Sequence, residues 1–458
     1  MKRIKNSIKT RHGASSIFLA IILSALILVE CTFLNYVWNL DYALSVNTAL
    51  KTEIDTVLSD YNRQLFDVYG IYAFSIDDVD DYCFNKALEI NGLDAKAELY
   101  VSSGYTLTAE DLKTAISSYY FYRGSGIAFK GIVEGYSDLL IEMDKRGIFS
   151  QVGKFMQSPA AGYLSQMIKG SETAEEWINK AGGLINLEDV LEEAEGLDSI
   201  RDDYKEFIRD FGLNIDIDIA NWDSLLKSIS GLESAVDLLS DNSPDAVKKF
   251  FVAHYCAYNF DCWIKPKGDA TINGTEFKAI HKDKHSDSEY LITGHNTAGV
   301  MELEFITANI LICANMLKDF ANEKFRNTVE AIAEVISMVI AALTEGAVQI
   351  NPKLIAVGLT FYIATVQALK DLLTVLGGGR AVIFEYEGQK MITMNYRDFL
   401  YLYSLCTPMD KLLSRSLEVL TRDYGTLYKG LKLEADFKGS TYSVDRSYAL
   451  YDDGEVIT

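Results

Sequence analysis

The sequence predicts an α+β protein that is mainly α, with a single N-terminal transmembrane helix that continues into a stalk helix. A helix-rich external domain with small β elements is expected to follow. Three observations predict this class. A long uncharged run follows a cationic leader, prolines are rare (five in 458 residues), and apolar residues recur at helical spacing along much of the chain.

The transmembrane helix is predicted over residues 14–34. Ala14 to Val29 hold no charge, and Glu30 is the first charged residue after this run. A helix rises about 1.5 Å per residue, so about 20 residues cross a hydrocarbon core of about 30 Å. The leader, residues 1–13, carries five cations and no acidic residue. The positive-inside rule therefore predicts a single-pass protein of the cell membrane, with a cytoplasmic N-terminus and an extracytoplasmic C-terminal domain.

Two other interpretations of this segment stay open. A cleaved secretory signal has an apolar core of about 7–15 residues and a small-residue cleavage site. The run here is longer, and no A-x-A pattern follows it. A lipoprotein signal needs a small residue before its cysteine, where Glu30 precedes Cys31. An uncut or prepilin-type anchor is therefore the favoured interpretation.

Composition limits the classes of partner. The net charge is −22, and the cationic leader leaves −27 for the rest of the chain. Nucleic acid is not expected as a partner, because phosphate binding needs clustered cations. The six cysteines show no regular spacing, which does not suit a disulfide scaffold. Buried free thiols are favoured, although Cys256 and Cys262 are close enough in sequence to pair.

After the anchor, a stalk helix is predicted over residues 35–66, a stretch without proline or glycine, and Gly70 ends its pattern. Residues 67–300 are expected to form an external α+β domain. Residues 301–458 are expected to form a helical region with C-terminal β elements.

Local signals predict the first elements of the external region. Ser75 is a candidate helix N-cap before a run of aspartates, which could instead bind calcium but lacks the spacing of a calcium loop. Residues 97–107 alternate loosely, which predicts a strand or a hairpin. Thr108 is expected to cap a helix, with Asp111 at the capping-box distance. Residues 147–242 suggest a series of short amphipathic helices, and Ser243-Pro244 opens another.

Later elements are predicted by apolar periodicity and by turn residues. They are an Asn-Gly hairpin at 271–277, strands at 288–293 and 382–388, helices at 307–320, 324–343, 353–376 and 396–405, and strand-like patches over 432–458. Helices 324–343 and 353–376 are apolar enough to suggest a membrane hairpin. The uncharged run 354–369 is short for a span, so buried core helices are favoured.

Few residues suggest a catalytic or metal-binding site. His281 and His285 are four residues apart with His295 nearby, but their segment is polar and follows a hairpin signal, so a loop is favoured over a metal site. His254 lies among aromatic residues and is expected to be a core histidine. No zinc-protease, nucleophile-elbow or P-loop motif occurs. No catalytic residue, cofactor or metal is predicted, and the chain is not expected to be an enzyme.

The N-terminal run RHGASSIFLAIILSALILVE, followed by a long helix, resembles TadE/TadG-like pilus-assembly proteins. The later chain is similar to a large Gram-positive family of unassigned function with the same anchor (domain of unknown function 5702). The stretches that carry this second resemblance are YNRQLFDVYGIYAF (61–74), TAISSYYFYRG (114–124), FFVAHYCAYNF (250–260), SEYLITGHNTAGVMELEF (288–305) and MNYRDFLYLYSL (394–405).

The resemblance implies a membrane-anchored, extracytoplasmic structural or assembly component of a Tad-type pilus or secretion system. Its expected partners are the membrane and other pilus-assembly proteins. It also makes Gly13–Ala14 the candidate processing site, although pilin-type precursors usually carry glutamate five residues into the mature chain, where Phe18 stands here. A surface receptor or adhesin-type binding module is the alternative function.

Overall fold

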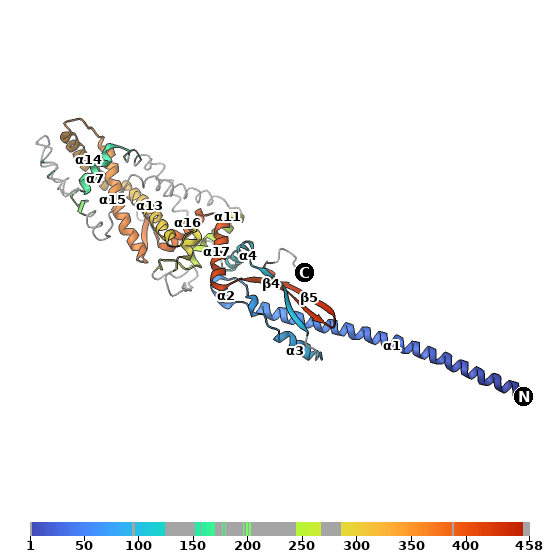
Figure 1. Cartoon of the computed structure of the whole chain (residues 1–458). Helices are drawn as coiled ribbons and strands as arrows, with labels where there is room; N and C mark the ends of the chain where they lie inside the picture. Colours follow the sequence, from blue (N-terminus) through green and yellow to red (C-terminus); the bar gives the residue numbers. More distant parts are fainter. Residues whose placement is uncertain are drawn as a thin grey trace. The chain divides into compact units, whose positions relative to one another are not determined.

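Figure 1 shows the computed structural model, which describes residues 2–93, 97–123, 157–169, 244–266, 285–386 and 389–451, with scattered positions between 151 and 202. The chain forms two compact units. Unit 1 joins Met1–Asp111 to Leu420–Thr458, and unit 2 comprises Leu112–Val419. The described residues are mainly helical with two small antiparallel sheets, which confirms the predicted class. The domain boundary expected near residue 300 stays a prediction.

The first helix, α1 (Lys2–Ser59), has two kinds of surface. Most large apolar side chains between Ile17 and Leu44 are exposed, whereas Val46, Leu50 and Ile54 are fully buried. The exposed part is long and apolar enough to cross a membrane. The helix thus fits an anchor that continues as a stalk, as predicted.

The prediction that this helix reaches Phe66 is wrong, because α1 ends at Ser59. Asn62 begins a separate helix, α2 (Arg63–Tyr69), where its Oδ1 accepts the backbone N–H of Leu65 at 2.9 Å. Asparagine favours such a cap because its side chain competes for backbone hydrogen bonds within a helix. Gly70 ends α2 with a left-handed φ of 68°.

Unit 1 contains a three-stranded antiparallel sheet in the order β1-β4-β5. Its strands are β1 (Glu98–Thr106), β4 (Tyr428–Phe437) and β5 (Ser440–Ser447). The strand predicted over residues 97–107 is therefore confirmed. The central strand β4 buries Leu431, Leu433 and Ala435, which alternate along it.

The core of unit 1 unites both ends of the chain. The buried face of α1 packs with alternate residues of β4 and with Phe84 and Leu88 of α3 (Tyr82–Ile90). Glu53 of α1 is 1% exposed, and its Oε2 accepts the backbone N–H of Phe84 at 2.6 Å, which satisfies a donor at the start of α3. Burial raises the pKa of Glu53 above its usual value.

Two predicted N-caps have different outcomes. Thr108 begins α4 (Ala109–Arg123), and the Thr108 and Asp111 side chains exchange hydrogen bonds with each other's backbone N–H, as predicted. Ser75 accepts from Asp77 but begins only a short 3-10 helix, η1 (Ile76–Asp78). The α-helix expected at Ser75 starts instead at Tyr82.

Unit 2 is mostly helical. Its described elements include α7 (Pro159–Lys169), α11 (Pro244–Tyr258), α12 (Asp287–Thr293), α13 (Thr297–Ala321), α14 (Glu323–Leu343), α15 (Pro352–Leu376), β2 (Ala381–Tyr386), β3 (Gln389–Met394), α16 (Tyr396–Cys406) and most of α17 (Met409–Tyr424). The helices expected near 324–343, 353–376 and 396–405 are confirmed, as is the helix after Ser243.

One predicted strand is wrong: residues 288–293 lie in α12. Asp287 and Glu289 occupy its first turn, where carboxylates complement the helix dipole, and Gly294 ends it with φ of 82°. The six residues 288–293 were too few for the spacing of apolar residues to distinguish a strand from a helix. α13 also begins ten residues before the predicted Thr307, and β3 and α17 were missed.

Besides the anchor, α13 and α15 are also long and apolar enough to cross a membrane. Most of each apolar window is buried within the structure, 61% in α13 and 67% in α15. Both helices contribute to the main core of unit 2 together with α14. This arrangement matches the favoured interpretation of the apolar run 354–369 as core.

All six cysteines are free. Cys256 and Cys262 are fully buried, and burial raises the pKa of each thiol to about 12. The favoured prediction of buried free thiols is confirmed for this pair. The predicted hairpin at 271–277, His281 and most of the region 147–242 lie outside the described residues.

The packing of α15 gives a first prediction. A Cβ added at Gly358 would lie 2.1 Å from a ring carbon of Phe155, so Gly358→Ala should overpack the core and cost about 1–3 kcal/mol. Gly162 in α7 is the matched control, because a Cβ there meets nothing within 4 Å. Gly162→Ala should be neutral or stabilising by about 0.5–1 kcal/mol. Denaturant unfolding of the detergent-solubilised chain measures both, and equal stabilities would contradict the contact.

Candidate functional site

The first candidate site is the exposed part of α1. Its side chains from Ser16 to Leu40 are all exposed, with Leu19 and Leu28 at 67% and 68%. Burying such side chains in hydrocarbon is favourable by about 25 cal/mol per Å² of apolar surface. The helical backbone continues through the candidate processing site, Gly13–Ala14. The long apolar helix therefore suggests a membrane anchor, and cleavage at Gly13 stays a prediction.

The second candidate is a buried group of polar residues in unit 2, where the end of α11 meets α12 and the start of α16. We call Glu289, Arg397 and Asp398 the polar cluster. These three side chains are between 0% and 4% exposed. Charged groups are rarely buried unless they are paired or hydrogen-bonded, so their partners decide what the cluster does.

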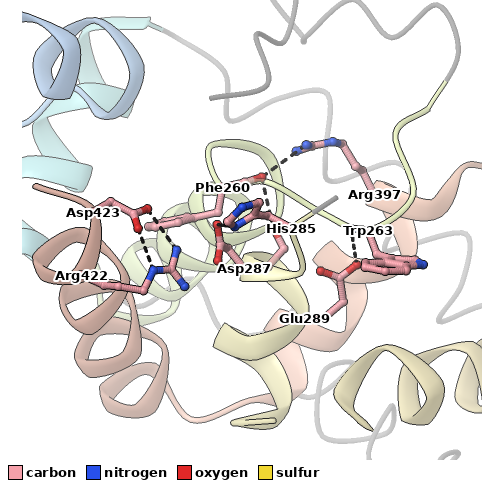
Figure 2. Close-up of polar contacts among 9 residues, drawn as sticks. Phe260, Trp263, His285, Asp287, Glu289, Arg397, Arg422 and Asp423 are labelled. Carbon is pink, nitrogen blue, oxygen red and sulfur yellow. Dashed lines mark hydrogen bonds and ion pairs between the residues drawn. The ribbon is translucent and has the colours of Figure 1, made fainter. Parts of the chain in front are cut away.

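Arg397 joins α16 to the end of α11. Its guanidinium donates to the carbonyl oxygen of Ala257 at 2.7 Å and to that of Phe260 at 3.3 Å, and Figure 2 shows it reaching Phe260. The last carbonyl groups of a helix carry its negative dipole end, where a cation is favourable. Arg397 therefore caps α11 from a neighbouring helix.

Glu289 joins α12 to the loop after α11. Its Oε1 accepts the backbone N–H of Trp263 at 2.9 Å, as Figure 2 shows. Burial raises the pKa of Glu289 to about 7, although the Trp263 N–H and the nearby Tyr396 and Arg397 act in the opposite direction. Its Oε2 has no partner with full hydrogen-bond geometry among the described residues, although the Tyr396 hydroxyl is near enough to favour the charged carboxylate. A proton on this carboxyl group at neutral pH would lessen the cost of that unpaired oxygen.

The Asp398 carboxylate accepts hydrogen bonds from three donors, and the Asp398 backbone N–H donates a fourth bond to Asn395 Oδ1. Asp398 forms a capping box with Asn395 at the start of α16, with both bonds at 2.9 Å. Arg380 donates to Oδ2 at 2.9 Å and the Tyr258 hydroxyl donates to Oδ1 at 2.5 Å. Asp398 thus connects α11, α16 and the start of β2. All of these bonds serve internal packing.

The histidines match the sequence interpretation. His254 is buried, its Nδ1 lies against the Tyr120 hydroxyl, and its ring stacks on Tyr258 at 4.5 Å between centroids. Burial, aided by the charge of Arg397, lowers the pKa of His254 to about 3, so the ring is neutral. This confirms a core histidine. His285 lies 3.9 Å from Asp287, and His295 is exposed.

No group of three or more metal-ligating side chains suited to an ion occurs among the residues that the structure describes. The polar cluster brings acids and a cation together, but Glu289 and Arg397 are at most 1% exposed, so a solute reaches them only if unit 2 opens. The arrangement is best suited to holding three helices in place. Sequence reasoning missed this cluster, although Glu289 is followed by Tyr-Leu-Ile and the Arg397-Asp398 pair stands between Tyr396 and Phe399.

Comparison of the chain with protein-family models, with curated proteins and with solved structures finds no match. The resemblance to pilus-assembly proteins stays a prediction.

Glu289 gives a pH-dependent prediction. Its pKa in the folded protein is raised above the unfolded value, so its stabilising contribution is full below about pH 4.5 and is lost as pH rises through about 7. Glu289→Gln does not titrate. The free energy of unfolding of the wild type should therefore fall, relative to this variant, by on the order of 3 kcal/mol between about pH 4.5 and about pH 8.

The control for this experiment is Glu302→Gln, because Glu302 is exposed on α13. Denaturant unfolding at several pH values should give a profile parallel to the wild type for Glu302→Gln. A parallel profile for Glu289→Gln as well would show that Glu289 does not titrate as its burial requires.

Proposed function

We propose that this protein is a membrane-anchored, extracytoplasmic structural or assembly component of a Tad-type pilus or secretion system. One observation carries the proposal: α1 passes without a break from an exposed apolar segment into the buried core of unit 1. A continuous helix fixes the folded unit to the anchor with no flexible linker between them. Such a connection suits a protein that is built into, or supports, an assembly at the membrane.

The orientation follows from the leader. Lys2, Arg3, Lys5, Lys9 and Arg11 precede the apolar segment without an acidic residue. The positive-inside rule keeps these cations in the cytoplasm, so both units face the extracytoplasmic side.

The contacts of the polar cluster support a structural role over a catalytic one. Its charged groups bind backbone groups and helix caps inside unit 2. The resemblance of the N-terminal run to TadE/TadG-like proteins supports the pilus context. A surface receptor or adhesin-type module shares the same anchor and is separated by the experiment below.

The proposal predicts that the tagged full-length chain, cross-linked in cells and extracted from membranes, co-isolates with pilus-assembly proteins. Leu23→Arg with Leu26→Arg should abolish both membrane retention and co-isolation, because each arginine near the centre of a span costs about 2.5–3.5 kcal/mol. Thr52→Arg with Thr56→Arg is the matched control, since both threonines are exposed on the same helix beyond the span.

Each outcome of this experiment separates the alternatives. A chain that stays in the membrane without pilus proteins would overturn the pilus role and favour a receptor or adhesin. Equal membrane retention of both double variants would overturn the anchor.

The mature N-terminus provides a second test. Phe18 stands where pilin-type precursors usually carry glutamate, so we expect an intact mass that begins at Met1 and a permanent anchor. A mass that begins at Ala14 would instead identify prepilin-type cleavage after Gly13 and a pilin-like subunit. Intact mass spectrometry of the membrane-extracted chain distinguishes the two.

A further inference from the structure

The apolar surface of α1 continues beyond the predicted end of the span at Leu34. Phe33, Leu34, Tyr36, Val37 and Trp38 are between 42% and 65% exposed. At about 100° per residue these five side chains span about 200° of the helix surface, and Asn35 and Asn39 lie on the remaining side. This apolar arc is wider than the stripe of about 100° by which a surface helix packs on its own protein, which suits lipid around most of the helix. The first charged residue after this segment is Asp41.

The residue types after Leu34 indicate how deep this part of α1 lies in the membrane. We call Tyr36 and Trp38 the aromatic collar. Trp38 lies about 6 Å beyond Leu34 along the axis, within the headgroup layer of about 5–8 Å that borders the hydrocarbon core. Tryptophan and tyrosine concentrate in this layer because their rings are apolar and their N–H or O–H groups bind water.

The packed part of unit 1 begins one helical turn after the collar along α1. The ring of Tyr42, four residues after Trp38, packs against Phe437 with 5.8 Å between centroids. The amine of Lys438 lies 3.5 Å from the centroid of the same ring. Lys438 and Gly439 form the tight turn of the β4–β5 hairpin, with φ of 50° and 78°. The tip of this hairpin is therefore held about 6 Å above Trp38.

We propose that the aromatic collar lies in the phospholipid headgroup layer, so that the hairpin tip of unit 1 rests at the membrane surface. The inference rests on the proposed anchor and extends it, since lipid contact is continuous from the apolar span to the collar. Lys438 can approach a lipid phosphate, while the neighbouring Asp41 and Asp436 oppose deeper entry. On this arrangement α1 has no free stalk between the bilayer and unit 1.

The test uses the fluorescence of Trp38 in the full-length chain, reconstituted in zwitterionic phosphatidylcholine vesicles. The lipids carry bromine, which quenches tryptophan on contact, either near the headgroup or near the ends of the acyl chains. Headgroup-proximal bromine should quench the wild type more strongly than chain-end bromine. Trp38→Phe should lose most of this quenching, and Trp263→Phe, which alters a tryptophan of unit 2, should retain it.

Vesicle flotation in the same samples separates this inference from the proposed anchor. Flotation without quenching that depends on Trp38 would overturn the inference and leave the anchor intact. Stronger quenching by chain-end bromine would place Trp38 in the hydrocarbon and would also overturn it. A third outcome is that brominated lipid does not quench Trp38 and that Trp38 is shielded from water only at high protein density in the vesicle. This outcome would overturn the inference and assign the collar to contact between copies of the chain. Loss of flotation would overturn the anchor itself.

Discussion

The central constraint on this protein is that one helix, α1, must be stable in two environments, an apolar one along its early part and the core of unit 1 along its later part. Its early part exposes apolar side chains on every side, which is unfavourable in water and favourable in lipid. Beyond Tyr42 the same helix presents only one buried face, and that face forms the core of unit 1 with β4 and α3. The position of unit 1 along the chain is thus set by where α1 changes from one surface to the other.

Unit 2 is organised by a different principle. Its large apolar core is formed by α13, α14 and α15, while the ends of shorter helices are joined by buried charges. Arg397 binds the carbonyl end of α11, and Glu289 binds the loop that follows it. Buried charges of this kind cost desolvation energy, and they are tolerated because directional hydrogen bonds satisfy them. Apolar packing alone would fix the relative orientation of these helix ends less strictly.

The sequence was informative where a single local signal determined the outcome. The uncharged run predicted the anchor, Thr108 and Asp111 predicted the start of α4, and long apolar patterns predicted α14 and α15. It failed where local signals were ambiguous. The run at 288–293 has no clear period, and the capping asparagine Asn62 went unrecognised, so the stalk helix was extended too far.

The polar cluster and the aromatic collar could not be derived from sequence, for a physical reason. Arg397 meets carbonyl groups of residues 257 and 260 through tertiary packing, and no local rule relates segments so far apart. The collar required knowledge of which faces of α1 stay uncovered by unit 1.

The pairing of β4 with β1, and the packing of β4 on α1, have a consequence for synthesis. α1 emerges from the ribosome long before β4, the strand that covers its core face, because all of unit 2 lies between them in the sequence. Contacts between such distant segments form late and slow folding. Unit 1 therefore stays incomplete, with the core face of α1 not yet covered by β4, until β4 has been made. During that interval the exposed apolar face of α1 makes the nascent chain prone to aggregation.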